Sequence, residues 1–217
     1  MQRARFRGVL LDVDGTLVDS NDAHAHAWSE ALAKFGHDLS FARARQLIGM
    51  GGDRLVEAAT GLPIDTRANK RIVDARSEIF LEKWLPTVRP IQGSRALVLR
   101  LRSDGYDYAL ASAAKTDELA PLLEIADIAD LVPKRTTSSD VEHSKPDPDT
   151  IEAALAKLQS VERSQAVMVG DTPFDVLAAR RANVAIIGVT CGGWPAEALA
   201  GAIEVATGPA ALAERFP

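Results

Sequence analysis

Acidic, hydroxyl and ammonium side chains follow short apolar stretches at several points in this sequence. Asp12 and Asp14 close one apolar run near the N-terminus, and Asp171 closes another. Ser112 ends a third, and Lys145 lies in a loop before a predicted helix. Short apolar runs that end in turn residues are typical of buried strands. Because ligands bind outside the carboxyl ends of parallel strands, we expect these side chains to share one pocket.

The residue types in this predicted pocket favour phosphoryl transfer. Closely packed carboxylates repel one another, and one of them must stay protonated unless a cation lies among them. Mg²⁺ suits such a site, because it prefers oxygen ligands and often completes its shell with phosphate. A carboxylate is also a competent nucleophile toward phosphorus and gives an aspartyl-phosphate. Lysine and serine side chains can hold the charged phosphoryl oxygens of the substrate.

The rest of the chain predicts the elements that must position these residues. Alternating strands and helices give βαβ units and a parallel sheet. Strands are expected at 6–13, 106–112, 166–169, 185–189 and 203–206, and a weak strand or turn near Leu131. Helices are expected at 94–103, 115–125, 148–158 and 173–182, with a last one at the C-terminus.

A block of helices interrupts this alternation after the first strand. Apolar residues at helical spacing predict helices at 21–35, at 41–48, from the loop 49–52 to Thr60, and from Pro63 to Pro86. An α/β domain with a helical insert explains both patterns. We predict a core at 1–18 and 87–217 and a helical cap at 19–86, with hinges near 18–20 and 85–90.

Composition narrows the class of protein. The chain has 217 residues, a formal net charge of −5 and a single cysteine, Cys191. An acidic balance without a basic stripe argues against a nucleic-acid polymer as partner. No stretch approaches the roughly 18 apolar residues of a membrane helix, so no membrane association is expected. One cysteine cannot form an internal disulfide, which fits a reducing compartment, and we predict a cytoplasmic location.

The ordered motifs resemble those of the haloacid dehalogenase superfamily. They are Asp12–Ser20, Ser112, Lys145-Pro146 and Gly170–Asp175. The likeness is greatest to its branch of phosphoglycolate phosphatases and β-phosphoglucomutases, which carry a helical cap after the first strand. The resemblance implies an α/β fold with a Rossmann-like, doubly wound parallel sheet.

The resemblance also implies two catalytic roles. Asp12 would be the nucleophile. Asp14 would be the general acid and base, protonating the leaving oxygen and then activating water. Dehalogenases of the superfamily lack an acid at the second position, so Asp14 points to phosphoryl transfer.

Further roles implied by the resemblance concern phosphate and metal. Ser112 and Lys145 would bind the phosphoryl group. Asp171, with the Asp12 carboxylate and the backbone carbonyl of Asp14, would bind Mg²⁺. Asp175 would support the metal's waters or Lys145.

Simpler interpretations exist for several of these residues. Asp14-Gly15 is a common turn, and Asp171 and Asp175 could cap a helix. His24 lies on an apolar helical stripe, where it would either pack in the cap core or assist the acid and base aspartate, as a histidine does in related mutases. Arg54 would either meet the leaving group or lie solvated on the surface. His26 is expected to be solvated.

The leading functional prediction is a Mg²⁺-dependent phosphatase that acts on a small phosphorylated metabolite as a monomer or homodimer. A sugar phosphomutase of the β-phosphoglucomutase type is the alternative. Mutases have an arginine where this chain has Gly52, which argues against that alternative. A catalytically silent fold used for binding is a third possibility, but all four motif residues that it would lose are present: Asp12, Asp14, Lys145 and Asp171.

Overall fold

Five parallel strands form the central sheet, in the order β4-β1-β5-β6-β7. The structure is a computed structural model that describes residues 6–216; residues 1–5 of the predicted core and its last residue, Pro217, lie outside this range. The strands are β1 (Gly8–Leu11), β4 (Asp107–Leu110), β5 (Ala166–Gly170), β6 (Ala185–Val189) and β7 (Glu204–Ala206). Crossover connections between parallel neighbours confirm the predicted α/β fold.

Helices cover both faces of the sheet because side chains alternate along each strand. Val9 and Leu11 of β1 pack in one apolar cluster with Leu97. Leu10 points to the opposite face and packs with Ile151. The first face carries α5 (Ser94–Ser103), α6 (Thr116–Ile125) and α9 (Pro209–Glu214), and the second carries α7 (Asp149–Ala156) and α8 (Pro173–Arg181). This is the doubly wound arrangement that the sequence predicts.

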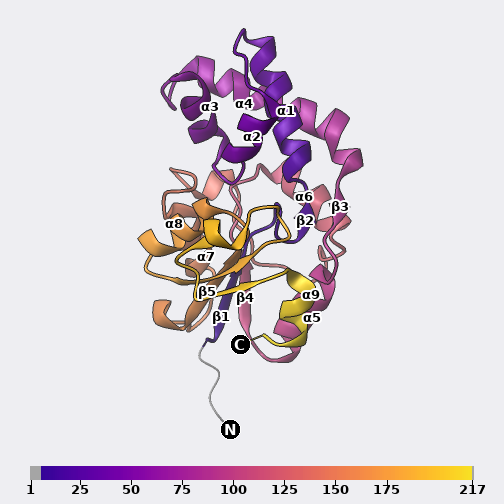
Figure 1. Cartoon of the computed structure of the whole chain (residues 1–217). Helices are drawn as coiled ribbons and strands as arrows, with labels where there is room; N and C mark the ends of the chain where they lie inside the picture. The colour runs from indigo at the N-terminus through magenta and orange to yellow at the C-terminus, as the bar shows by residue number, and fades with distance from the viewer. Residues whose placement is uncertain (1–5, 217) are drawn as a thin grey trace.

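Four helices lie beyond the carboxyl edge of the sheet, at the top of Figure 1. They are α1 (Asn21–Lys34), α2 (Phe41–Leu47), α3 (Gly52–Thr60) and α4 (Arg67–Ile79). They enclose an apolar cluster of their own, in which Trp28 and Leu32 pack with Leu55. The chain enters and leaves this insert through β2 (Val18–Asp19) and β3 (Arg89–Pro90), which pair antiparallel. The domain limits and hinge motion stay predictions.

The helix predicted from Pro63 to Pro86 differs from the structure at both ends. The helix expected from Pro63 begins at Arg67, because the Thr66 hydroxyl accepts a hydrogen bond from the Asn69 N–H at 3.1 Å and caps the first turn. The helix continues beyond α4 as a π-helical turn, Phe80–Trp84, and a short 3₁₀ turn. Near Leu131, where the sequence predicts a weak strand or a turn, the turn is confirmed: residues 129–131 form a turn, and an isolated bridge joins Leu110 and Arg135 just beyond it.

His26 is not solvated as the sequence suggested. Its ring stacks on Trp84 with centroids 4.2 Å apart and lies 4.4 Å from the ring of Phe41. The π-helical turn brings Trp84 back against α1, a contact that the local pattern of α1 could not reveal.

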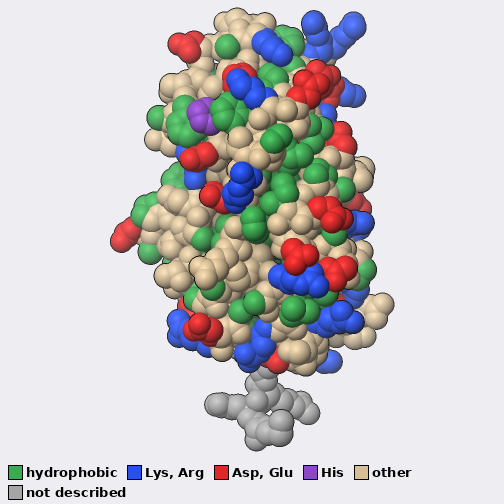
Figure 2. All heavy atoms as spheres, turned by 90° about the vertical axis from the view of Figure 1, so that its right-hand side faces the viewer, with side chains coloured by type: hydrophobic (Ala, Val, Ile, Leu, Met, Phe, Trp, Pro, Cys, Tyr) green, Lys and Arg blue, Asp and Glu red, His purple; other side chains and the backbone are tan. Residues whose placement is uncertain are grey.

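The surface carries mixed charge. On the face that Figure 2 shows, acidic and basic side chains are interspersed. None of the helices within residues 6–216 has the length and apolar character that crossing a bilayer requires.

Candidate active site

Asp12 and Asp171 lie side by side because the strands that precede them are paired in register. Leu11 of β1 is opposite Val169 of β5, and the Asp12 N–H donates to the Val169 carbonyl at 3.0 Å. The Thr16 hydroxyl is 3.3 Å from one oxygen of Asp12 and 3.2 Å from one of Asp171. The parallel sheet therefore brings two carboxylates that are far apart in sequence into one buried cluster.

Lys145 lies among these carboxylates. Its buried ammonium is 2.5 Å from Asp12 Oδ1 and 2.7 Å from Asp175 Oδ1. Burial would lower the pKa of Lys145, but Asp12 and Asp175 outweigh it and raise the pKa. Lys145 therefore stays protonated and holds the Asp12 carboxylate in a fixed position.

Asp175 also caps the first turn of α8. It occupies the third position of α8 and forms a capping box with Thr172, whose N–H donates to it at 3.0 Å and whose hydroxyl donates at 2.7 Å. One oxygen of Asp175 thus caps α8 while the other faces Lys145. The start of the helix positions the lysine, and through it Asp12.

The donor set fits a divalent cation. Oxygen atoms of Asp12, Asp171 and Asp175 all lie within 4.8 Å of one another, and all three residues are buried. Burial and neighbouring carboxylates raise the pKa of Asp12 to about 7, against the opposing effect of Lys145, and raise that of Asp171 well above its usual value. Three buried carboxyl groups share one ammonium, so without a cation the cluster retains protons, and a bound cation would take their place. An all-oxygen set suits Mg²⁺, Ca²⁺ or Mn²⁺.

Asp14 points from the same loop toward the cap. Its Oδ1 accepts from the Ser20 hydroxyl at 2.5 Å and is 2.9 Å from His24 Nε2. Burial would raise the pKa of Asp14, but its contacts with His24 and Ser20 lower it to about 2. The structure therefore brings His24 to Asp14, and Asp14 is ionised in this arrangement.

The other ring nitrogen of His24 faces a buried ion pair, Arg76 with Glu118, that the sequence did not reveal. Arg76 of α4 is 3.4 Å from His24 Nδ1 and donates to Glu118 of α6 at 2.7 Å. Ser77 donates to the other oxygen of Glu118 at 2.5 Å. Because arginine only donates, His24 Nδ1 must accept, which leaves the Nε2 proton facing Asp14. Arg76 and Glu118 lie 42 residues apart on separate amphipathic helices, so no local motif pointed to the pair.

Asn21 is a second residue that the motifs left out. Its amide donates to Asp171 Oδ2 at 2.9 Å and to the Gly192 carbonyl at 3.0 Å. Gly15 makes room for this contact: its φ is +72°, and a Cβ there would collide with the side chains of both Asn21 and Asp171. An asparagine directly after the Asp12–Ser20 motif was the available signal.

Ser112 lines the same small cavity as Asp12 and Asp14. Its Oγ accepts the Ala114 N–H at 3.1 Å, so its own proton is free to donate. The cavity has a volume of about 90 Å³, and its lining includes Asp12, Asp14, His24, Ser112, Lys145, Arg76 and Glu118. Five of the residues singled out in the sequence therefore line one cavity.

Two other residues lie elsewhere. Arg54 contacts Asp147 at 2.5 Å and Glu57 at 3.5 Å. It lines neither this cavity nor a second, larger cavity that lies beside it between the cap and the core. Cys191 is half-buried with its sulfur 3.3 Å from the Gly15 carbonyl, and burial together with Asp171 raises the pKa of its thiol to about 12. Arg54 thus joins cap to core, and Cys191 is a protonated packing residue.

A parallel α/β sheet with aspartates, a lysine and a serine around one small cavity defines a class of enzymes that hydrolyse phosphoric monoesters. The chain belongs to the haloacid dehalogenase-like hydrolase family, whose model matches residues 9–189.

Individual relatives agree with this assignment. A phosphoglycolate phosphatase of Yersinia pseudotuberculosis is 34% identical over 202 residues, which are 90% of this chain and 85% of the relative. The crystal structure of a hydrolase from Pseudomonas syringae is 28% identical, with a TM-score of 0.86 over 95% of this chain and 96% of its own. A β-phosphoglucomutase from Clostridium difficile is similar in fold, with 18% identity, a TM-score of 0.81 and coverage of 94% and 92%. The protein is a phosphatase of the haloacid dehalogenase-like type. Phosphatases of this family generally use a divalent metal ion.

Proposed function

We propose that the protein is a Mg²⁺-dependent phosphatase that hydrolyses a small phosphorylated metabolite through an aspartyl-phosphate on Asp12. The observation that carries this proposal is the contact between Lys145 and Asp12 at 2.5 Å, at the wall of a cavity that Asp14 also faces. A carboxylate fixed by a buried cation is restrained in the orientation that nucleophilic attack needs.

In the first step, a carboxylate oxygen of Asp12 attacks phosphorus and the bond to the leaving oxygen breaks. Asp14, which is ionised in the arrangement without substrate, must be protonated for this step and then gives its proton to that oxygen. In the second step, the Asp14 carboxylate takes a proton from water as the water oxygen attacks phosphorus. The bond between phosphorus and Asp12 breaks, which releases phosphate and restores both residues. The low pKa of Asp14 describes the carboxylate form that the second step uses.

Four other side chains would act on the phosphoryl group and the metal. Ser112 and Lys145 donate to phosphoryl oxygens and stabilise the charge that develops on them. Asp171 and the Asp12 carboxylate, with the Asp14 carbonyl, would hold Mg²⁺, and Asp175 would keep Lys145 in place. The bound ion would offset the negative charge shared by phosphate and carboxylates.

The substrate is proposed only as a class. The Yersinia relative acts on phosphoglycolate by its name, and another relative from Streptomyces hygroscopicus, 26% identical, is a validoxylamine A 7'-phosphate phosphatase. These names span a two-carbon acid and a much larger alcohol. The cytoplasmic location and the monomeric or homodimeric state stay predictions.

A panel of phosphorylated metabolites, assayed with and without Mg²⁺ and scored by kcat/KM, tests the proposal. We expect Mg²⁺-dependent release of phosphate from at least one compound and none with Asp12→Asn. Turnover that survives exhaustive chelation, or full activity in Asp12→Asn, would contradict it.

A phosphomutase is a second candidate, favoured by the contact of 2.9 Å between His24 and Asp14. A mutase returns the phosphoryl group to the sugar, so the same panel separates the two: a mutase yields an isomeric sugar phosphate, and a phosphatase yields free phosphate.

A further inference from the structure

A second and larger cavity adjoins the phosphoryl cavity. Its volume is about 600 Å³, and it lies between the cap, at α3 and α4, and core loops that include Lys115 and Ser144. The two cavities share Gly51, Gly52 and Arg76 among their lining residues. Ligand pockets in proteins hold roughly 300–1,000 Å³, so the larger cavity suits a whole leaving group and the smaller one does not.

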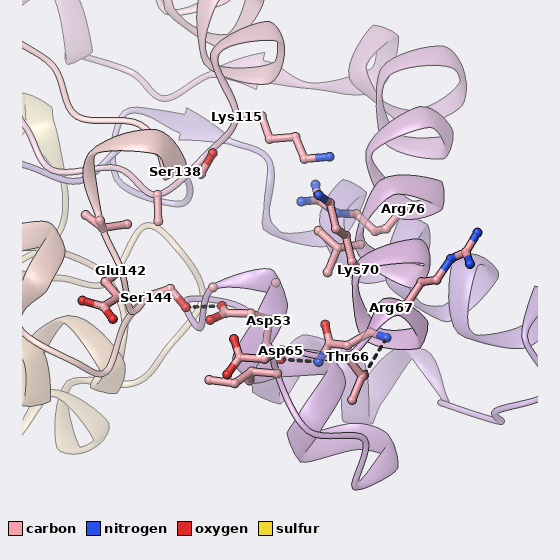
Figure 3. Close-up of a pocket in the computed structure, with 17 residues that line it drawn as sticks. Asp53, Asp65, Thr66, Arg67, Lys70, Arg76, Lys115, Ser138, Glu142 and Ser144 are labelled. Carbon is pink, nitrogen blue, oxygen red and sulfur yellow. Dashed lines mark hydrogen bonds between the residues drawn. The ribbon is translucent and has the colours of Figure 1, made fainter.

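One wall of this larger cavity is basic. In Figure 3 the side chains of Lys70, Arg76 and Lys115 extend toward the same part of the cavity, while Arg67 extends away from it. Arg76 is paired with Glu118 at 2.7 Å, and Lys115 is paired with Asp74 at 2.7 Å.

Lys70 differs from its two neighbours. Its side chain is exposed to the cavity, and among the described residues no carboxylate lies within ion-pair distance of its ammonium. Three cations that face one space repel one another, and side chains neutralise only two of them. An anionic group on the ligand would supply the missing partner.

The opposite wall offers acceptors for hydroxyl groups. Asp53 and Asp65 of the cap and Ser144 of the core lie near one another in Figure 3, on the side of the cavity away from the ammonium groups of Lys70 and Lys115, and the Ser144 hydroxyl donates to Asp53. The Glu142 carboxylate lines the same side but extends away from these three residues. Carboxylates on this side would repel an anion and accept hydrogen bonds from sugar or polyol hydroxyls. The two walls therefore suit different parts of one polar molecule.

We propose that the preferred substrate is a phosphate monoester whose alcohol is hydroxylated, longer than two carbons, and carries a second anionic group that Lys70 binds. This inference rests on the proposed function, because it places the transferred phosphoryl group at Asp12. A two-carbon leaving group would leave most of the 600 Å³ unfilled and would not span the two walls. Lys70 is then the residue that determines specificity for the second charge.

Three matched compounds test the inference: glucose 1,6-bisphosphate, 6-phosphogluconate and glucose 6-phosphate. Glucose 1,6-bisphosphate carries a phosphate as its second anionic group, and 6-phosphogluconate carries a carboxylate. Glucose 6-phosphate carries no second anionic group. Titration calorimetry in the presence of Mg²⁺ uses the Asp12→Asn protein, so that no compound is consumed. We expect at least one of the first two to bind at least about tenfold tighter than glucose 6-phosphate. The better of the two identifies the second anion.

Two further variants in the Asp12→Asn protein assign the effect. Lys70→Gln should remove most of the preference for the second anion. Arg71→Gln is the matched control, because Arg71 is the next residue of α4 and its guanidinium lies 5.4 Å from the ring centroid of Phe35. The control should keep the preference. Equal affinity for all three compounds, a preference that survives Lys70→Gln, or an equal loss in Arg71→Gln would overturn the inference.

Phosphate release by the wild-type protein distinguishes this failure from failure of the proposed function. Release from the three compounds at equal kcat/KM would leave the phosphatase standing and overturn the role of Lys70. Preferential binding without release of phosphate from any phosphoester would support the anion site and contradict the phosphatase.

Discussion

The two halves of the active site balance their charges in different ways. On the core side, Asp12, Asp171 and Asp175 share a single ammonium, that of Lys145, and the pKa of Asp12 rises to about 7. At the boundary with the cap, the buried charges beside His24 are matched one to one, since Arg76 pairs with Glu118 at 2.7 Å. The carboxylate cluster of the core needs a cation to balance its charge, whereas the buried pair of Arg76 and Glu118 is balanced by itself.

This contrast assigns different roles to the two sets of residues: the carboxylates of the core react, and the ion pair at the cap boundary positions His24. Carboxylates held at unfavourably close range can bind a metal and react with phosphorus. A neutralised ion pair at the boundary between cap and core cannot react, but it can fix His24 against Asp14 and hold the cap in place.

The largest expected effect is on the core side. Asp12→Asn removes the nucleophile and should lower kcat by at least about 10⁴-fold, as loss of a catalytic nucleophile does elsewhere. Asp14→Asn removes the proton transfer, which contributes about 10²–10⁴-fold. Rapid-quench kinetics should show no burst in the first variant and an accumulated intermediate in the second with a good leaving group. Similar defects at the same step would remove the distinction between the two aspartates.

Glu118→Gln breaks the ion pair between α6 of the core and α4 of the cap, and it should affect stability. It leaves buried Arg76 unpaired, which costs about 3 kcal/mol in the free energy of unfolding at pH 7. Urea unfolding measures this loss of stability. Glu124→Gln, on the exposed side of the same helix, is the control.

The same variant has a predicted pH dependence. Burial would raise the pKa of Glu118, but Arg76, His24 and Ser77 outweigh it and lower the pKa below its usual value. The folded state therefore binds this proton less readily than the unfolded state, and ionised Glu118 stabilises the fold above about pH 4.3. That contribution is lost as the pH falls through the folded pKa. The difference between wild type and Glu118→Gln should shrink under those acid conditions, and a constant difference would contradict the ion-pair account.

Asp171→Ala should raise the Mg²⁺ concentration for half-maximal activity by at least about 100-fold, or abolish turnover, since it removes one of the clustered carboxylates. Ca²⁺ should bind but support turnover poorly, because it prefers looser coordination. Metal titrations of activity measure both effects. An unchanged metal requirement in the variant would exclude Asp171 as a ligand.

The smallest effects are expected for single cap residues. His24→Ala should slow a substrate with a poor leaving group by roughly tenfold or more and an aryl phosphate little, because a good leaving group needs no proton from Asp14. Arg54→Ala should cost no more than about 1 kcal/mol of stability, since Arg54 forms a part-exposed ion pair with Asp147. Equal kinetic losses on both substrates in His24→Ala would indicate a general defect in folding or chemistry.

The sequence was most informative where function depends on strand ends. Asp12 and Asp171 each follow a short apolar strand, so pairing of parallel strands sufficed to predict that they meet. The start of α4 was less predictable, because Pro63 and Thr66 are both plausible first residues and only the Thr66 cap decides between them. Arg76 and Glu118 could not be paired in advance, since their contact depends on how the cap sits on the core.

The direct test of the central claim is to identify the residue that carries the phosphoryl group. The Asp14→Asn protein, mixed with Mg²⁺ and a ³²P-labelled aryl phosphate and quenched in acid, should retain label on the peptide that contains Asp12. The double variant with Asp12→Asn should retain none. Label on another residue, or wild-type turnover with no labelled protein in any variant, would contradict the account.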